Sequence, residues 1–176
     1  EAADAVRELK EAGITKVVMM TGDSERTAAA IAKRVGVDEY YSEVLPEDKA
    51  SFVEKEKKLG HKVIMIGDGI NDSLALSSAS VGIAISDGAA IAREIADVTI
   101  SADNLHEIVT LKRLSTALMK RIHNNYRTII GVNGGLIALG VTGVIMPTTS
   151  ALLHNLSTLT ISLRSMRNLL PKEEEA

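Results

Sequence analysis

Two carboxylates and one amide lie in the short loop 67–72, Gly-Asp-Gly-Ile-Asn-Asp, directly after an apolar run. Carboxylates separated by a glycine turn can approach a single hard cation, and Mg²⁺ prefers a few carboxylate oxygens together with water and phosphate oxygen. Asp68 and Asp72 are therefore predicted Mg²⁺ ligands, with Asp72 expected to be a solvated carboxylate at a sheet edge. The alternative makes Asp68 a turn residue and Asp72 a helix cap.

A second polar loop, Thr21-Gly22-Asp23, follows the apolar run 16–20. A hydroxyl and successive backbone N–H groups at a helix N-terminus can hold phosphate oxygens. The loop is therefore a candidate phosphate site. Alone it is a weak signal, because Asp23 or Ser24 could simply cap the helix that follows.

Lys49 is the third candidate, in the segment Leu-Pro-Glu-Asp-Lys at 45–49. A lysine near the start of a helix is unfavourable for the helix dipole, which indicates another role. A positive charge placed on a phosphoryl group is such a role. The alternative is an ordinary solvated surface lysine.

Alternating helical and strand patterns surround these motifs. Apolar spacing and glycine stops predict helices at 2–12, 24–35, 46–59 and 71–78, and strands at 16–20, 40–44, 63–66, 81–85 and 97–100. This alternation is typical of an α/β fold with a parallel sheet and helices on both faces. The polar loops then fall at the carboxyl edge of the sheet, where α/β proteins bind ligands.

Beyond the α/β pattern, a helix is predicted over 105–127, and the composition then changes sharply. Residues 128–146 contain no charged side chain, and as a helix they would extend about 30 Å, enough for a bilayer. Pro147-Thr148-Thr149 indicates a turn, and 150–163 is a second uncharged run. Lysines and arginines precede the first run and follow the second, which predicts a transmembrane hairpin with both ends cytoplasmic. The alternative is a buried hairpin of a soluble protein.

Four polar side chains lie within the predicted hairpin: Asn133, His154, Ser157 and Thr158. Polar groups inside a bilayer are costly and often mark a transport path. A neutral imidazole such as that of His154 is a common ligand for divalent transition metals. The alternative role for these residues is hydrogen bonding between helices.

Overall composition excludes several classes of function. The net charge of -3, with both signs mixed, provides no basic face for nucleic acid. The absence of cysteine excludes disulfides and thiolate chemistry within this stretch. The first residues open a helical pattern without an initiator methionine, so we expect a piece of a longer protein.

Taken together, T-G-D, L-P-x-x-K and G-D-G-x-N-D-x-x-A-L resemble the later part of the phosphorylation domain of heavy-metal-transporting P-type ATPases, in the haloacid dehalogenase superfamily. The resemblance implies that Thr21, in its loop with Gly22 and Asp23, and Lys49 contact an aspartyl-phosphate. It also implies that Asp68 and Asp72 hold Mg²⁺ with help from Asn71. The D-K-T-G-T motif of the phosphorylated aspartate is missing, so the chain alone is expected to be inactive.

The resemblance also implies a domain organisation. Residues 1–102 would be the C-terminal part of a haloacid-dehalogenase-like (Rossmann-like) phosphorylation domain lacking its central nucleophile strand, and 103–127 a connecting amphipathic helix. Residues 128–170 would form the transmembrane hairpin and 171–176 a cytoplasmic tail. The protein would be multi-pass in a membrane, the cell membrane in a prokaryote, with residues 1–127 also cytoplasmic.

The implied function is ATP-driven export of a transition metal, with Mg²⁺ as cofactor and ATP as substrate of the intact pump. Its partners would be membrane lipid, the remaining pump domains and the metal cargo. The run 154–158 is closer to the H-E-G-G-T of cobalt- or zinc-type pumps than to the M-x-x-S-S of copper pumps, which favours a divalent metal (Zn, Co, Cd, Ni or Fe) over Cu(I). Two alternatives are a membrane-anchored phosphatase of the same superfamily and a non-catalytic domain that pairs through its incomplete sheet.

Overall fold

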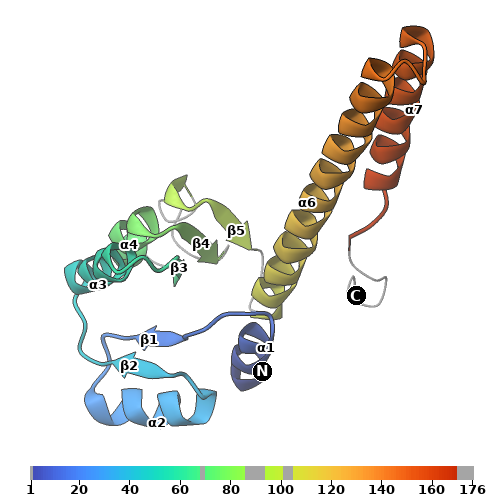
Figure 1. Cartoon of the computed structure of the whole chain (residues 1–176). Helices are drawn as coiled ribbons and strands as arrows, with labels where there is room; N and C mark the ends of the chain where they lie inside the picture. The colour runs from blue at the N-terminus through green and yellow to red at the C-terminus, as the bar shows by residue number, and fades with distance from the viewer. Residues whose placement is uncertain (1, 68–69, 86–93, 101–104, 170–176) are drawn as a thin grey trace. The chain divides into compact units, whose positions relative to one another are not determined.

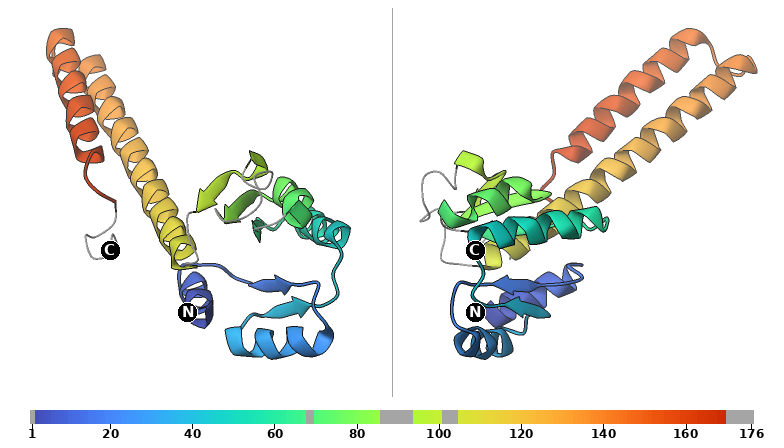
Figure 2. Two further views of the ribbon diagram at one scale, coloured as in Figure 1. Left: turned by 180° about the vertical axis from the view of Figure 1, so that it is seen from behind. Right: turned by 90° about the vertical axis from the view of Figure 1, so that its left-hand side faces the viewer.

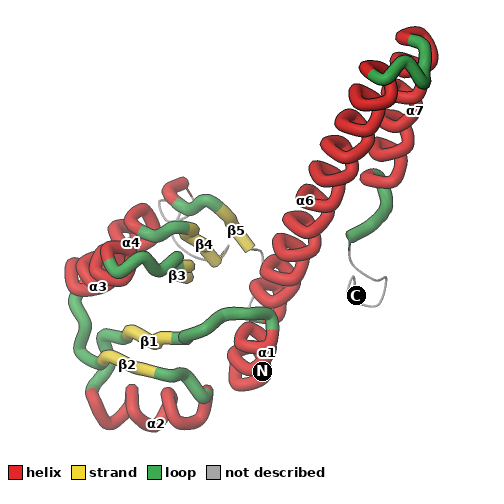
Figure 3. Tube along the Cα trace, in the orientation of Figure 1, coloured by secondary structure: helices red, strands yellow, loops and turns green. Residues whose placement is uncertain are grey.

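The computed structural model describes all residues except 1, 68–69, 86–93, 101–104 and 170–176. The chain forms two compact units, residues 1–109 and 110–176. The first unit combines short strands with helices, and the second is helical (Figure 3).

The first unit contains the elements that the sequence predicts (Figure 1). They are α1 (Ala2–Glu11), β1 (Val18–Met20), α2 (Glu25–Val35), β2 (Glu39–Tyr41), α3 (Pro46–Lys58), β3 (Ile64–Gly67), the 3-10 turn η1 (Ile70–Asp72), α4 (Ser73–Ser78), β4 (Val81–Ile85) and β5 (Val98–Ile100). The strand expected at 40–44 is shorter and earlier. Glu43 N–H donates to Asp23 O and Val44 N–H to Thr21 O, so the backbone after β2 holds a loop instead of extending the strand.

All described strand pairs are parallel, as expected, but they form two sheets, β1-β2 and β3-β4-β5 (Figures 1 and 2). Among the described residues, β1 pairs only with β2, and β3 only with β4. The strands that precede the two polar loops have not closed up against each other. This arrangement agrees with a sheet that lacks its central strand.

The hydrophobic core of the first unit lies between α3, α4, β3 and β4. Its buried members are Val53, Met65, Ala75, Leu76 and Ala84. Gly82 in β4 permits the close packing of α4, because a Cβ at this position would lie 2.7 Å from Leu76 O. This packing fixes the end of β3 relative to α3, which is where the candidate site lies.

The second unit is a hairpin of antiparallel helices, α6 (His106–Val141) and α7 (Pro147–Ser165), which lie side by side in both views of Figure 2. The segments expected at 103–127 and 128–146 share one helix, because α6 continues through Arg127. The helix also stops before Met146, since Gly143 adopts a left-handed φ of 72° and its N–H donates to Gly140 O. Pro147, expected in the turn, is the first residue of α7, where its missing N–H has no cost.

In the described part of the chain, no helix is both long enough and apolar enough to cross a membrane. The two helices α6 and α7 confirm the expected helical hairpin. The expectation that this hairpin spans a membrane is not confirmed.

Candidate functional site

Lys49 and Asp72 form an ion pair at the carboxyl end of β3. Lys49 Nζ, in the first turns of α3, donates to Asp72 Oδ1 at 2.8 Å. The two side chains are only 15% and 11% exposed, so the expectation that Asp72 is a solvated carboxylate was wrong. Asp72 occupies the N-cap position of α4 but its side chain makes no capping hydrogen bond. Its carboxylate is directed to a cation instead.

Gly67, the last residue of β3, makes room for this carboxylate. A Cβ at Gly67 would lie 2.6 Å from Asp72 Cβ and 2.9 Å from Asp72 Cγ. Contacts this short do not occur between real side chains, so the position requires glycine. Sequence reasoning gave Gly67 no role; the available signal was a glycine that ends a strand next to a carboxylate motif.

The other predicted members of the magnesium site are less well defined. Asp68 lies outside the described residues. Asn71 is exposed beside Asp72. No cluster of three or more histidine or acidic side chains suited to a metal ion occurs among the residues that the structure describes. Of the two predicted Mg²⁺ ligands, only Asp72 lies in the described part of the chain, as a largely buried carboxylate paired with Lys49.

The Thr21 loop is held by its own hydrogen bonds. Thr21 Oγ1 donates to Asp23 Oδ2 at 2.8 Å and accepts from Asp23 N–H at 3.1 Å. Thr21 N–H also donates to Tyr41 O at 3.0 Å, which ties the loop to the end of β2. Ser24 is the N-cap of α2 but its side chain does not cap the helix. The loop is thus a turn after β1 that is held by hydrogen bonds of its first residue, Thr21.

The two halves of the candidate site remain separate. Among the described residues, no hydrogen bond or ion pair joins the loop Thr21–Asp23 to Lys49 or Asp72. Each half nevertheless follows the carboxyl end of a parallel strand, β1 for one and β3 for the other. Parallel strands place such groups at the ligand-binding edge of an α/β fold.

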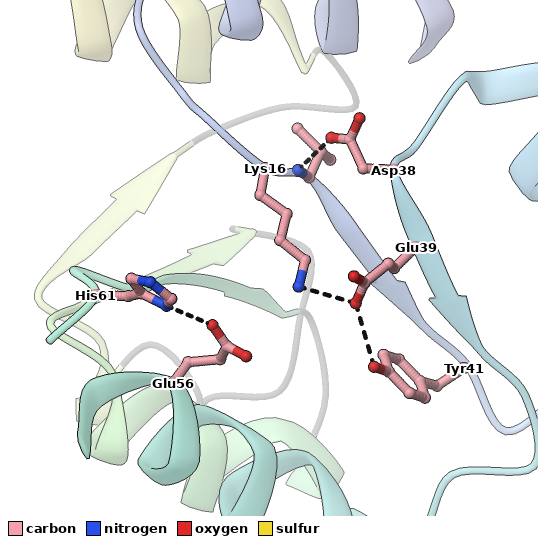
Figure 4. Close-up of polar contacts among 7 residues, drawn as sticks. Lys16, Asp38, Glu39, Tyr41, Glu56 and His61 are labelled. Atoms are coloured by element: carbon pink, nitrogen blue, oxygen red, sulfur yellow. Dashed lines mark hydrogen bonds and ion pairs between the residues drawn. The ribbon is translucent and has the colours of Figure 1, made fainter. Parts of the chain in front are cut away.

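A different polar cluster joins Lys16, which precedes β1, to the first and last residues of β2 (Figure 4). Lys16 Nζ pairs with Glu39 Oε2 at 2.9 Å, and Tyr41 OH donates to the same oxygen at 3.2 Å. The hydrogen bond to Glu39 raises the pKa of Lys16, and the same bond lowers the pKa of Glu39. Nearby, His61 Nδ1 lies 2.6 Å from Glu56 Oε2. Lys16 and His61 precede β1 and β3, whereas the candidate site follows these strands, so we assign this cluster to the scaffold.

In the hairpin, the structure brings together two of the four predicted cargo residues. His154 Nδ1 and Asn133 Oδ1 lie 2.8 Å apart. Because an amide oxygen only accepts, this contact is a hydrogen bond when Nδ1 carries the proton, and in the neutral imidazole Nε2 is then the acceptor. Ser157 and Thr158 instead donate their hydroxyls to His154 O at 2.8 and 3.0 Å, which is local bonding within α7.

Comparison with known proteins identifies the family. The chain is 38% identical over 168 residues to a zinc-exporting P-type ATPase of Mycobacterium marinum, and 40% identical over 163 residues to a copper-exporting P-type ATPase of Bacillus subtilis. These matches cover 95% and 93% of the chain. The chain belongs to the heavy-metal-transporting P-type ATPase family. A manganese-exporting P-type ATPase of Mycobacterium leprae is 37% identical over 168 residues, also 95% of the chain.

Family and structural comparisons agree. Residues 1–80 match the model of haloacid dehalogenase-like hydrolases. A crystal structure of a zinc-transporting PIB-type ATPase in its E2.Pi state matches with a TM-score of 0.87 and 32% identity, covering 96% of this chain and 27% of that one. The chain spans only 23% of the zinc and manganese exporters and 20% of the copper exporter. The relatives named for zinc, manganese and copper do not decide between a divalent cargo and Cu(I).

Proposed function

We propose that this chain supplies the Mg²⁺- and phosphate-binding part of the phosphorylation domain, and part of the cargo path, of an ATP-driven transition-metal exporter. The observation that carries the proposal is the pairing of Lys49 with Asp72 beside Gly67. A cation and a carboxylate at the end of a parallel strand supply the opposite charges that a Mg²⁺-phosphate group requires. The family's ATPase relatives do not favour the phosphatase or the non-catalytic alternative.

Within the proposed site each residue has a separate task. Asp72, together with Asp68, would hold Mg²⁺, which when bound neutralises phosphate charge. Lys49 would place its ammonium group on a phosphoryl oxygen. The Thr21 hydroxyl, which donates to Asp23 in this structure, would turn its single proton to another phosphoryl oxygen. Asn71 would assist at the metal. The described residues include no activated nucleophile, so a phosphorylated aspartate would come from elsewhere in the intact pump.

For the hairpin we propose a place in the membrane of a multi-pass pump, with the first unit cytoplasmic. Large apolar side chains are exposed along both helices, including Ile130 at 53%, Ile137 at 66% and Leu152 at 67%. Such a surface requires cover by lipid or by other helices. The contact of His154 with Asn133 orients an imidazole whose Nε2 lone pair suits a borderline divalent metal, so we favour a divalent cargo over Cu(I). Ser157 and Thr158 can add oxygen lone pairs on the same helix.

The test uses the intact pump with Asp72→Asn and Lys49→Ala. Both variants should lose metal-stimulated ATP hydrolysis by at least about 100-fold, the loss typical when one positioned charge-stabilising group is removed. Lys55→Ala is the matched control, because Lys55 is an exposed lysine of the same helix. Normal turnover with normal Mg²⁺ dependence in Asp72→Asn would refute the assignment.

A further inference from the structure

A cavity of about 350 Å³ lies in the second unit, where the first half of α6 meets the end of α7. Its lining includes four basic side chains, Lys120, Arg121, Arg164 and Arg167, and three asparagine side chains. A concave site that combines several cations with amide groups suits an anion that accepts many hydrogen bonds.

Arg121 lines the cavity and connects α6 to the chain at the end of α7. Its Nη1 donates to Ser165 O and its Nη2 to Asn168 O, each at 3.0 Å, and Nη1 also contacts Arg167 O. Ser165 is the last residue of α7, where helices leave carbonyls unpaired, and Arg167 and Asn168 follow directly after the helix. Asn125 Nδ2 adds a bond of 2.7 Å to Ser165 Oγ. Arg121 and Asn125 therefore join α6 to the end of α7, the segment that carries Arg164 and Arg167.

The remaining three cations lack acidic partners within the described part of the chain. The salt bridges of the described residues include none of Lys120, Arg164 and Arg167. The sequence from 108 to 172 contains eight lysines and arginines and no aspartate or glutamate. A cluster of like charges without counter-charges attracts an external anion.

Exposed apolar side chains are sequence neighbours of the basic residues that line the cavity. Ile122, Leu163 and Met166 are 49%, 59% and 80% exposed, and they lie on the same segments as the basic side chains. A soluble phosphate would contact only the basic side chains, whereas an amphiphile would contact both the basic side chains and the apolar ones. We propose that this cavity binds the phosphate headgroup of an anionic lipid through Lys120, Arg164 and Arg167. The site is distinct from metal export, because neither cargo nor nucleotide takes part in it.

The test measures binding of short-chain phosphatidylglycerol to the protein purified in neutral detergent, by native mass spectrometry. Phosphatidylcholine of equal chain length and inorganic phosphate are titrated in parallel. Phosphatidylglycerol should bind more tightly than either. Arg164→Gln with Arg167→Gln should weaken its binding by roughly 30-fold, since each basic residue near an anionic headgroup contributes on the order of 1 kcal/mol. Binding of phosphatidylcholine should not change.

The matched control removes two cations of the same unit that do not line the cavity, with Lys112→Gln and Arg127→Gln. An equal loss in this control would show diffuse attraction and overturn the proposal. The proposal would also be overturned if inorganic phosphate bound as tightly as phosphatidylglycerol. Equal binding of phosphatidylcholine and phosphatidylglycerol would overturn it too. Binding that appears only after Glu173–Glu175 are changed to glutamine would assign the cavity to this acidic segment instead of lipid.

Discussion

Lys49 and Asp72 are 23 residues apart in the sequence, yet their side chains meet at 2.8 Å. Both are largely buried, so each depends on the other for compensation. Lys49→Met should lower the free energy of unfolding by about 1 to 3 kcal/mol, because Asp72 is left without its donor. Denaturant unfolding of the purified chain measures this loss.

A double-mutant cycle separates the ion pair from the packing of the lysine stem. Asp72→Asn keeps an acceptor but removes the charge, so the double variant Lys49→Met with Asp72→Asn should lose less than the sum of the single variants. Lys55→Met, at an exposed position on α3, should change stability by no more than about 0.5 kcal/mol. Additive losses would show that the pair is not coupled.

Mg²⁺ should stabilise the first unit through Asp72. A ligand that binds only the folded state adds about 2.7 kcal/mol when its concentration is a hundredfold above Kd. The unfolding temperature should therefore rise with Mg²⁺ and fall back on chelation, and Asp72→Asn should abolish most of the rise. Glu47→Gln, which removes an exposed carboxylate near the start of α3, should leave the rise intact. A response of equal size in both variants would place Mg²⁺ elsewhere.

Gly67→Ala should destabilise the chain and disturb the ion pair, because its Cβ would lie 2.6 Å from Asp72 Cβ. Crowding of this kind costs about 1 to 3 kcal/mol. Gly22→Ala is the control, since a Cβ there meets only Val44 O at 4.0 Å. Thermal unfolding of the two variants checks the difference, and similar stabilities would mean that the end of β3 adjusts without cost.

The sequence predicted the order and type of the elements because helical and strand periodicities are local properties. Motif chemistry likewise indicated Asp72, Lys49 and Thr21. The burial of Asp72 and its pairing with Lys49 could not be predicted, since both depend on how α3 packs against the end of β3. The missing motif implied an absent central strand, but it did not decide whether β1 and β3 would pair with each other. The end of α6 was not predictable either, because it depends on the backbone conformation at Gly143.

Asp38 should make the stability of the first unit sensitive to acid. It accepts from Lys10 Nζ at 2.7 Å and from Val17 N–H at 2.8 Å, and these bonds lower its pKa, with the Lys10 bond contributing most. A carboxyl whose pKa is lower in the folded state stabilises the fold above its unfolded pKa, about 3.9, and this contribution is lost as the pH falls through the folded pKa. Stability should therefore decline below about pH 4.

Asp38→Asn should lower the free energy of unfolding at neutral pH and reduce its decline below about pH 4. Denaturant unfolding at a series of pH values measures both effects. Asp4→Asn is the control, because the pair of Asp4 with Arg7 is exposed and such pairs contribute little. If the free energy of unfolding of Asp38→Asn declines as steeply at low pH as that of the unchanged chain, other carboxylates cause the decline. Glu25 is the next candidate, since its hydrogen bonds from Ser42 and then Tyr40 also lower its pKa.

His154 gives the sharpest test of the cargo path. Its contact with Asn133 fits two roles, a hydrogen bond that joins α6 to α7 and an imidazole positioned for a metal. His154→Gln keeps a group that can bond Asn133 but removes the ring nitrogen that a divalent metal favours. If His154 is a ligand, metal-stimulated ATP hydrolysis of the intact pump should fall about 10- to 100-fold while its thermal stability stays near normal.

Asn133→Ala should cause a smaller loss of metal stimulation together with a lower unfolding temperature, because it removes the partner and leaves the ligand. Unchanged stimulation of His154→Gln by every divalent metal tested would make this histidine structural and place cargo binding on other parts of the pump.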